Sequence, residues 1–295
     1  MTHLAATVSP EWLSLREPAD HAARSRDLVD AFRQVLPDGG LVVHDLGSGT
    51  GSMTRWLAPQ LPGPQRWVLH DRDADLLARA AAVAPLQTAD GARVNLATRL
   101  GDVTTLRATD LAGADLVTTS ALLDLLTADE VKRLAVACVN GSCSALFTLS
   151  VTGKVVLTPA HWLDDAIGAA FDAHQRRTVA GRRLLGPDAV ERTAEAFDRL
   201  GATVLTRVSP WQLGADDLGL VVEWLAGWVG AACEQRPELA DPARAYLRQR
   251  LAEAAAGQLR VTVGHADLLA FGPHEPGRTT GRQRTCSGQK GASGR

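Results

Sequence analysis

The stretch "VVHDLGSGTGSMTRWLA", residues 42–58, joins an apolar run to a helix-like segment through three glycines in five positions. Glycine loses more conformational freedom on folding than other residues, so Gly47, Gly49 and Gly51 must serve a purpose. At a strand-to-helix turn, glycines let the backbone approach a ligand closely and present N–H groups at the positive end of a helix. The stretch therefore predicts a ligand-binding loop after a β-strand.

The spacing of this loop excludes two phosphate-binding loops. A dinucleotide fingerprint, G-x-G-x-x-G, needs a third glycine at position 52, which is Ser52. A Walker loop is also excluded, because no Gly-Lys-Ser/Thr follows the glycines. Instead, Asp45 stands two residues before the G-x-G-x-G string. A carboxylate there suits a cationic or amino-bearing ligand better than a pyrophosphate.

Two further carboxylates come at the ends of the next two predicted strands. Asp71 ends the run 66–71, and a carboxylate at a strand tip can accept hydrogen bonds from both hydroxyls of a ribose. Asp102 ends the run 94–102 and suits an adenine amino group. Each acid alone is also explained as a turn or capping residue. Together with Asp45 they predict a ligand with an amino acid moiety, a ribose and an adenine.

Strand-like and helix-like segments alternate from residue 41 onward. The predicted strands cover 41–46, 66–71, 94–102, 114–120, 143–151, 202–209 and 259–271. Strands separated by helices imply an α/β class with a doubly wound, mostly parallel sheet. Helical periodicity predicts extra N-terminal helices and a helical insertion between the last two strands.

The organisation we expect is a single domain over 1–271, made of an N-terminal helical cap (1–40), a cofactor half (41–151) and an acceptor half (152–271). The segment 272–295 is rich in Gly, Ser and Arg without an apolar period, and we expect a disordered basic tail.

The composition of the chain limits the classes of partner that we expect it to bind. The formal charge of -2 over 295 residues argues against an obligatory nucleic-acid partner. The chain opens without a signal-peptide pattern and has no apolar run of membrane-spanning length, so we expect a cytoplasmic protein without a membrane partner. The histidines are scattered without zinc spacing, so no metal is predicted. The oligomeric state stays open.

Residues 41–126 resemble the cofactor half of the class I S-adenosylmethionine-dependent methyltransferases. The family's glycine motif matches "DLGSGTG", its strand-end acids match Asp71 and Asp102, and "ADLVTTSALLDLL" (114–126) resembles its next motif. The resemblance implies a Rossmann-like methyltransferase fold, S-adenosyl-L-methionine as cofactor and a small-molecule acceptor, a metabolite or natural-product intermediate. It leaves open whether oxygen, nitrogen or carbon is methylated.

The resemblance also implies a set of cofactor-binding residues, drawn from the glycine loop, the strand ends and the N-terminal helices. They are Asp45, Gly47, Ser48, Gly49, Gly51, Asp71, Arg72, Asp102, Val103, Ser120 and Arg24. N-terminal helices often close over the donor site in this family, where Arg24 would clamp the methionine carboxylate. The alternative is that Arg24, like Arg16 and Asp20, belongs to a solvent-exposed charged face.

His174 is the best candidate for a general base, because its pKa is in the neutral range and its segment is where many small-molecule members build the acceptor pocket. Its alternative role is a packed histidine on an apolar helix face. Arg176 is a candidate for binding an acidic group of the acceptor. Trp211, at a strand exit, is a candidate for stacking on the acceptor. Asp124 follows the fourth strand and is a weaker base candidate, with helix capping as its alternative role.

Two other function classes were weighed. Methylation of a nucleic acid is disfavoured, because the fourth strand is not followed by an Asn/Asp-Pro-Pro-aromatic element that would hold a flipped base. A non-catalytic S-adenosylmethionine-binding scaffold or sensor is the alternative to an enzyme. Methyl transfer requires an opening for the acceptor above the methyl group, whereas a scaffold could fill this space, so the presence of an opening would discriminate the two.

Overall fold

The computed structural model describes residues 8–37, 39–83 and 86–271, so the predicted tail lies outside the described residues. The main sheet has the order β3-β2-β1-β4-β5-β10-β8, and β9 pairs with β10 as well. Its strands are Leu41–Leu46 (β1), Gln65–Asp71 (β2), Val94–Leu100 (β3), Leu116–Ser120 (β4), Ser144–Thr158 (β5), Thr203–Val208 (β8), Trp211–Leu213 (β9) and Arg260–Phe271 (β10). A separate two-stranded hairpin pairs Thr178–Val179 (β6) with Arg182–Arg183 (β7).

The sheet confirms the predicted α/β class. The strands β3, β2, β1, β4 and β5 pair in parallel, whereas β10 lies antiparallel between β5 and β8. This order, with a reversed last strand next to the sixth predicted strand, is that of the Rossmann-like methyltransferase fold. One predicted boundary is wrong: β5 continues past residue 151 to Thr158, because residues 155–158 pair with β10.

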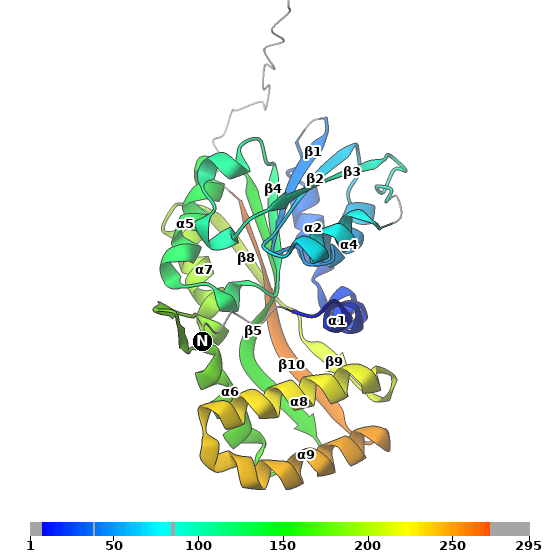
Figure 1. Ribbon diagram of the computed structural model, residues 1–295. Helices are drawn as coiled ribbons and strands as arrows, with labels where there is room; N and C mark the ends of the chain where they lie inside the picture. The colour runs from blue at the N-terminus through cyan, green and yellow to red at the C-terminus, as the bar shows by residue number, and fades with distance from the viewer. Residues whose placement is uncertain (1–7, 38, 84–85, 272–295) are drawn as a thin grey trace, which may run out of the picture.

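Helices cover both faces of the sheet, as a doubly wound fold requires. The helices are Pro10–Ala23 (α1), Arg26–Arg33 (α2), Ser52–Leu57 (α3), Ala74–Ala81 (α4), Ala128–Asn140 (α5), Asp164–Gln175 (α6), Ala189–Asp198 (α7), Leu218–Gln235 (α8) and Ala240–Ala255 (α9). On one face, α2, α3 and α4 share a buried cluster with Val43 of β1 and Trp67 of β2. On the other face, α5 and α7 pack on the sheet (Figure 1).

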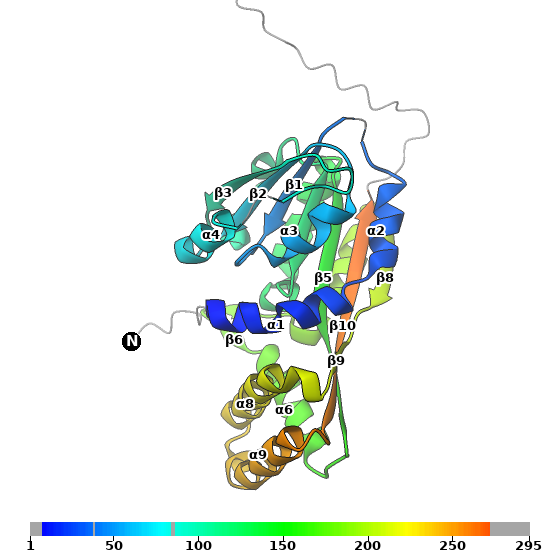
Figure 2. The same ribbon diagram turned by 90° about the vertical axis from the view of Figure 1, so that its right-hand side faces the viewer.

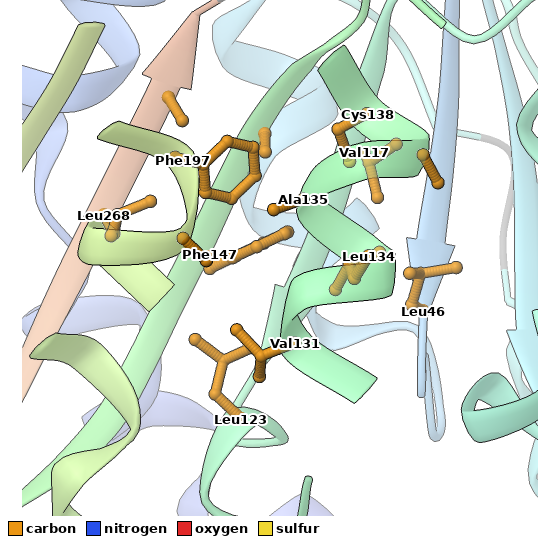
Figure 3. Close-up of a cluster of buried hydrophobic side chains, with 14 of the residues drawn as sticks. Leu46, Val117, Leu123, Val131, Leu134, Ala135, Cys138, Phe147, Phe197 and Leu268 are labelled. Carbon is orange, nitrogen blue, oxygen red and sulfur yellow. The ribbon is translucent and has the colours of Figure 1, made fainter. Parts of the chain in front are cut away.

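The cluster under α5 and α7 is the core that Figure 3 draws, with Val117, Phe147 and Leu268 from the sheet and Leu134 and Phe197 from the helices. The rings of Phe147 and Phe197 lie 6.0 Å apart. Because β strands alternate their side chains between faces, Leu46 joins this cluster while Val43 of the same strand joins the other.

A lobe of three helices, α6, α8 and α9, packs on the extended ends of β5 and β10 (Figure 1). The expected helical insertion is confirmed, since α8 and α9 lie between β9 and β10. The aromatic rings of Trp224 and Trp228 stack 5.1 Å apart in the buried core of this lobe.

A buried arginine connects two helices of the lobe. Arg250 of α9 is 0% exposed and donates to both carboxylate oxygens of Asp164, at 2.8 and 2.7 Å. It also donates to Glu253 Oε2 at 2.8 Å and to the Pro159 carbonyl at 2.7 Å. Tyr246 O–H donates to Asp164 Oδ1 at 2.7 Å. Asp164 begins α6, so this network fixes α9 against α6.

Helix α1 runs across the molecule between the sheet and the helical lobe, and α2 then lies along the sheet (Figure 2). Ser9 caps α1 by accepting from Trp12 N–H, and Pro10 occupies its first turn. The helix contacts β9 and α8. Among the described residues, no helix is long and apolar enough to cross a membrane.

Candidate functional site

The glycine loop follows β1 and adopts left-handed backbone conformations at all three glycines, with φ of +63° at Gly47, +53° at Gly49 and +83° at Gly51. This conformation is costly for other residues, which explains why the loop needs glycine. The end of β2 closes the loop: Gly49 N–H donates to Asp71 Oδ2 at 2.8 Å, and Ser48 N–H donates to the His70 carbonyl at 3.0 Å. Asp71 therefore positions the loop.

Two leucines cover the glycines. A Cβ built on Gly47 would lie 3.2 Å from the nearest carbon of Leu122, in the segment after β4. A Cβ on Gly49 would lie 3.1 Å from Leu13 Cδ1 of α1. The loop is thus bounded on one side by the β4 end and on the other by the N-terminal helix.

Substitution of Gly49 by alanine is expected to lower the free energy of unfolding by about 1–2 kcal/mol, the usual cost of a left-handed conformation for an L-residue. Gly227 supplies a matched control, because it is an exposed position inside α8 with nothing within 4 Å of an added Cβ. Gly227→Ala is expected to stabilise by about 0.5–1 kcal/mol. Urea unfolding of both variants checks the opposite signs, and equal shifts would contradict the argument.

Asp45 is a buried carboxyl group with one unused oxygen. Asp45 lies beside Thr118, because β1 and β4 pair with these two residues opposite each other. Its Oδ1 accepts a hydrogen bond from Thr118 Oγ1 at 2.7 Å. Its Oδ2 is buried without a hydrogen-bond partner in the described part of the chain. Burial raises the pKa of Asp45 to about 7, against lowering contributions from Thr118 and from the Arg24 charge.

Arg24 is buried at the same edge of the sheet, which overturns its alternative reading as part of an exposed charged face. Only 3% of its surface is exposed. Its Nη1 and Nη2 each lie 3.2 Å from Ser52 Oγ, at the start of α3, and Nη2 donates to Ser120 Oγ at 2.9 Å, at the end of β4. Its Nε has no hydrogen-bond partner among the described residues. The guanidinium also lies over Trp56, 5.5 Å from the ring centre.

Arg24 and Asp45 therefore form a pair of opposite charges beside the glycine loop, each with an unsatisfied buried atom. Buried polar atoms normally find a partner, so an unsatisfied donor and an unsatisfied acceptor beside the same loop suit a polar ligand. The Oγ of Ser48, within the loop, is likewise buried and has no hydrogen-bond partner in the described ranges of the chain. A ligand that carries both a carboxylate and an ammonium group matches this arrangement.

The end of β3 borders a cavity of about 140 Å³. Its lining includes Leu100, Asp102 and Val103. Asp102 Oδ1 accepts from Thr104 N–H at 2.8 Å and caps the short turn Val103–Thr105, so the capping role considered for this acid is present. The residue is exposed. Arg72, directly after Asp71, is also exposed.

His174, on α6, and Arg176, just after this helix, each have a polar partner outside the glycine loop. His174 Nε2 lies 3.2 Å from Glu234 Oε2 of α8, and its Nδ1 lies 3.2 Å from Arg177 Nη1. Arg176 forms a two-bond pair with Asp188, at 2.9 and 2.7 Å. No hydrogen bond joins either residue to the glycine loop within the described residues. Both side chains therefore have partners of their own.

Trp211 is buried under α1 and is not exposed at its strand exit. Only 3% of its surface is exposed, and its Nε1 donates to Asp20 Oδ1 at 3.0 Å. The Arg16 guanidinium lies 5.0 Å from its ring centre, and Arg16 also donates to both oxygens of Asp20, at 2.9 and 3.1 Å. The sequence could not indicate this, because the ring is covered by a helix almost two hundred residues away in the chain.

Asp124 lies in the short turn Leu123–Leu125 that follows β4, and it is partly buried. Burial raises the pKa of its carboxyl to about 6, while the positive charges of Arg16 and Arg177 lower it. A carboxylate with a pKa near neutrality can take up a proton at physiological pH. The sequence does not reveal this property of Asp124, because the burial that shifts its pKa depends on elements distant in sequence.

Comparisons with known proteins give structural matches only. No protein-family model matches the chain, and no curated protein sequence matches it. The cyclopropane synthase MmaA2 from Mycobacterium tuberculosis is 15% identical, with 89% of this chain and 94% of that chain covered and a TM-score of 0.46. An S-adenosylmethionine-dependent methyltransferase from Geobacter sulfurreducens, in complex with S-adenosyl-L-homocysteine, is 18% identical, with 88% and 98% covered and a TM-score of 0.42. One from Thiobacillus denitrificans, in the same complex, is 16% identical, with 90% and 100% covered and a TM-score of 0.42.

Proposed function

We propose that this protein binds S-adenosyl-L-methionine and transfers its methyl group to a small-molecule acceptor. The observation that carries the proposal is the buried Arg24 and Asp45 beside the glycine loop, with an unused donor at Nε and an unused acceptor at Oδ2. The carboxylate of a methionine moiety suits Arg24, and its ammonium group suits Asp45. Asp71 and Asp102 are the carboxylates for the ribose hydroxyls and the adenine amino group.

S-adenosyl-L-methionine supplies an electrophilic methyl group on a positive sulfonium. The remaining task of the chain is to hold the acceptor in line with that methyl group, and orientation of this kind lowers a reaction barrier substantially. Helix α1 covers the glycine loop through Leu13 and through a pair of hydrogen bonds from Arg55 to Glu17, at 2.6 and 2.5 Å. We propose that this cover limits the access of bulk water to the bound donor.

Asp124 is the residue that we propose as proton acceptor for an oxygen or nitrogen nucleophile. It follows β4, where the resemblance puts the reactive methyl group, and its pKa of about 6 suits a base near neutral pH. His174, the base expected from the sequence, is paired with Glu234 instead. We therefore assign the base role to Asp124.

Calorimetric titration tests the proposal with S-adenosylmethionine, S-adenosylhomocysteine and NAD, beside an Asp71→Ala variant. We expect micromolar binding of the first two ligands and its loss in the variant, because Asp71 holds both the loop and the proposed ribose site. No binding of either ligand, or a preference for NAD, would overturn the proposal.

The affinity for S-adenosylhomocysteine is expected to rise with pH and to level off above about pH 7. In the free protein burial raises the pKa of Asp45 to about 7, so the carboxyl is protonated at lower pH. An ammonium group binds the ionised form, so binding releases a proton and weakens by up to about tenfold per pH unit below that pKa. Titrations between about pH 5.5 and 8 measure the slope. Asp45→Asn should bind more weakly and with a flat profile; a flat wild-type profile would contradict this role.

A further inference from the structure

We infer that Asp267 is a positioning residue of the proposed cofactor site, which sets the position of Arg24 by holding the junction between α1 and α2. The inference rests on the proposed function, because it concerns how Arg24 is held in the proposed cofactor site. Asp267 belongs to β10, far in sequence from the glycine loop and from every residue assigned to the site.

The Asp267 carboxylate is 0% exposed and accepts three hydrogen bonds. Its Oδ2 accepts from Ser25 N–H at 2.7 Å. Its Oδ1 accepts from Leu149 N–H at 2.8 Å and from Ser209 Oγ at 2.6 Å. The donors come from the α1–α2 junction, from β5 and from the end of β8. One side chain therefore joins three separate segments at the centre of the molecule.

The bond to β5 exists because the ladder between β5 and β10 is interrupted here. The pairing of Ala266 with Ser150 is followed by that of Leu268 with Phe147, so the register shifts across Asp267. Leu149, on the opposite side, has a φ of +56°. Its N–H donates to the Asp267 side chain at 2.8 Å. This anchors Asp267 firmly in the sheet.

The hydrogen bond from Ser25 N–H links Asp267 to the backbone next to Arg24. Arg24 is an extended residue, with φ of -56° and ψ of 134°, that separates the helices α1 and α2. Its own N–H donates to the Asp20 carbonyl at 3.1 Å, and the next N–H along the chain, that of Ser25, is held by Asp267. Both peptide groups that flank Arg24 are thus held in place. This fixes the backbone from which the Arg24 side chain reaches Ser52 and Ser120.

Asparagine cannot replace this carboxylate fully. An ionised aspartate offers acceptors on both oxygens, whereas an asparagine has one acceptor oxygen and an amide group that only donates. With the oxygen kept toward Leu149 and Ser209, the amide of an Asp267→Asn variant would face the Ser25 N–H, donor against donor. The substitution therefore disturbs the junction beside Arg24 more than the sheet.

The test compares two ligands that differ by the amino acid moiety, S-adenosylhomocysteine and 5′-methylthioadenosine. Asp267→Asn is expected to lower the affinity for S-adenosylhomocysteine at least about tenfold. The affinity for 5′-methylthioadenosine should change by less than about twofold. Ser209→Ala is the matched control, because it removes a hydrogen bond to the same carboxylate on the side away from Arg24; we expect both affinities unchanged. Added to Arg24→Ala, Asp267→Asn is expected to have no further effect on S-adenosylhomocysteine, as residues that act through one another are not additive.

Ser25→Pro provides a second test. Proline adopts the φ of -70° found at Ser25, but it has no N–H and therefore loses the hydrogen bond to Asp267. It should reproduce the selective loss, and thermal unfolding verifies that each variant is folded. Equal weakening of both ligands, or an additive effect with Arg24→Ala, would overturn the inference while the proposed function stands. Wild-type protein that binds neither ligand would overturn the proposed function, and the inference with it.

Discussion

Replacing Arg24 with alanine should weaken S-adenosylhomocysteine binding by about thirtyfold or more. The variant removes the buried guanidinium proposed for the methionine carboxylate, and the loss of one partner of a buried charge pair costs about 2–5 kcal/mol. Ser52 and Ser120 each lose a hydrogen bond from the guanidinium, but neither side chain carries a charge that would be left unpaired. Calorimetry at constant pH and ionic strength measures the change.

Two comparisons make this result specific. Arg26→Ala, an exposed arginine at the start of α2, changes the net charge equally and should leave the affinity unaltered. For 5′-methylthioadenosine, which lacks the amino acid moiety, Arg24→Ala should have little effect. A parallel loss for both ligands would mean that Arg24 supports the fold and not the carboxylate.

The largest effect on stability is expected for Arg250→Ala. This side chain, fully buried, holds Asp164, Glu253 and the Pro159 carbonyl together. Removing it leaves the carboxylate of Asp164 without its cation in a largely buried setting, a change that typically costs about 3–5 kcal/mol. Urea unfolding followed by circular dichroism measures the free energy of unfolding.

Arg248→Ala is the control, because Arg248 lies on the same helix but is exposed. A surface substitution of this kind usually stays within about 0.5 kcal/mol. If the two variants unfolded at the same urea concentration, the buried network would contribute nothing to the attachment of α9.

The α/β class, its mostly parallel sheet and the glycine loop were predictable because their signals are local. The alternation of apolar runs, the spacing of Gly47, Gly49 and Gly51, and the acids Asp45 and Asp71 are all read within a few residues. The structure adds the left-handed backbone of each glycine and the bond from Gly49 N–H to Asp71, which both follow from a strand-to-helix turn.

The surroundings of the site were less predictable, since they depend on α1 crossing the molecule. The burial of Arg24 at the end of this helix and of Trp211 under it joins residues that the sequence separates widely. The same holds for Asp267, whose three donors come from distant segments. Periodicity detects which face of an element is apolar, but it carries no information about which polar side chains meet across elements.

The lengths of β5 and β10, 15 and 12 residues, have a mechanical consequence. The two strands are hydrogen-bonded from the sheet to the far end of the helical lobe, with pairs from Ala145–Ala270 to Thr158–Arg260. Although the register shifts twice along this ladder, the paired strands join the sheet to the lobe directly, so the lobe is not attached through a single flexible linker as a separate domain would be.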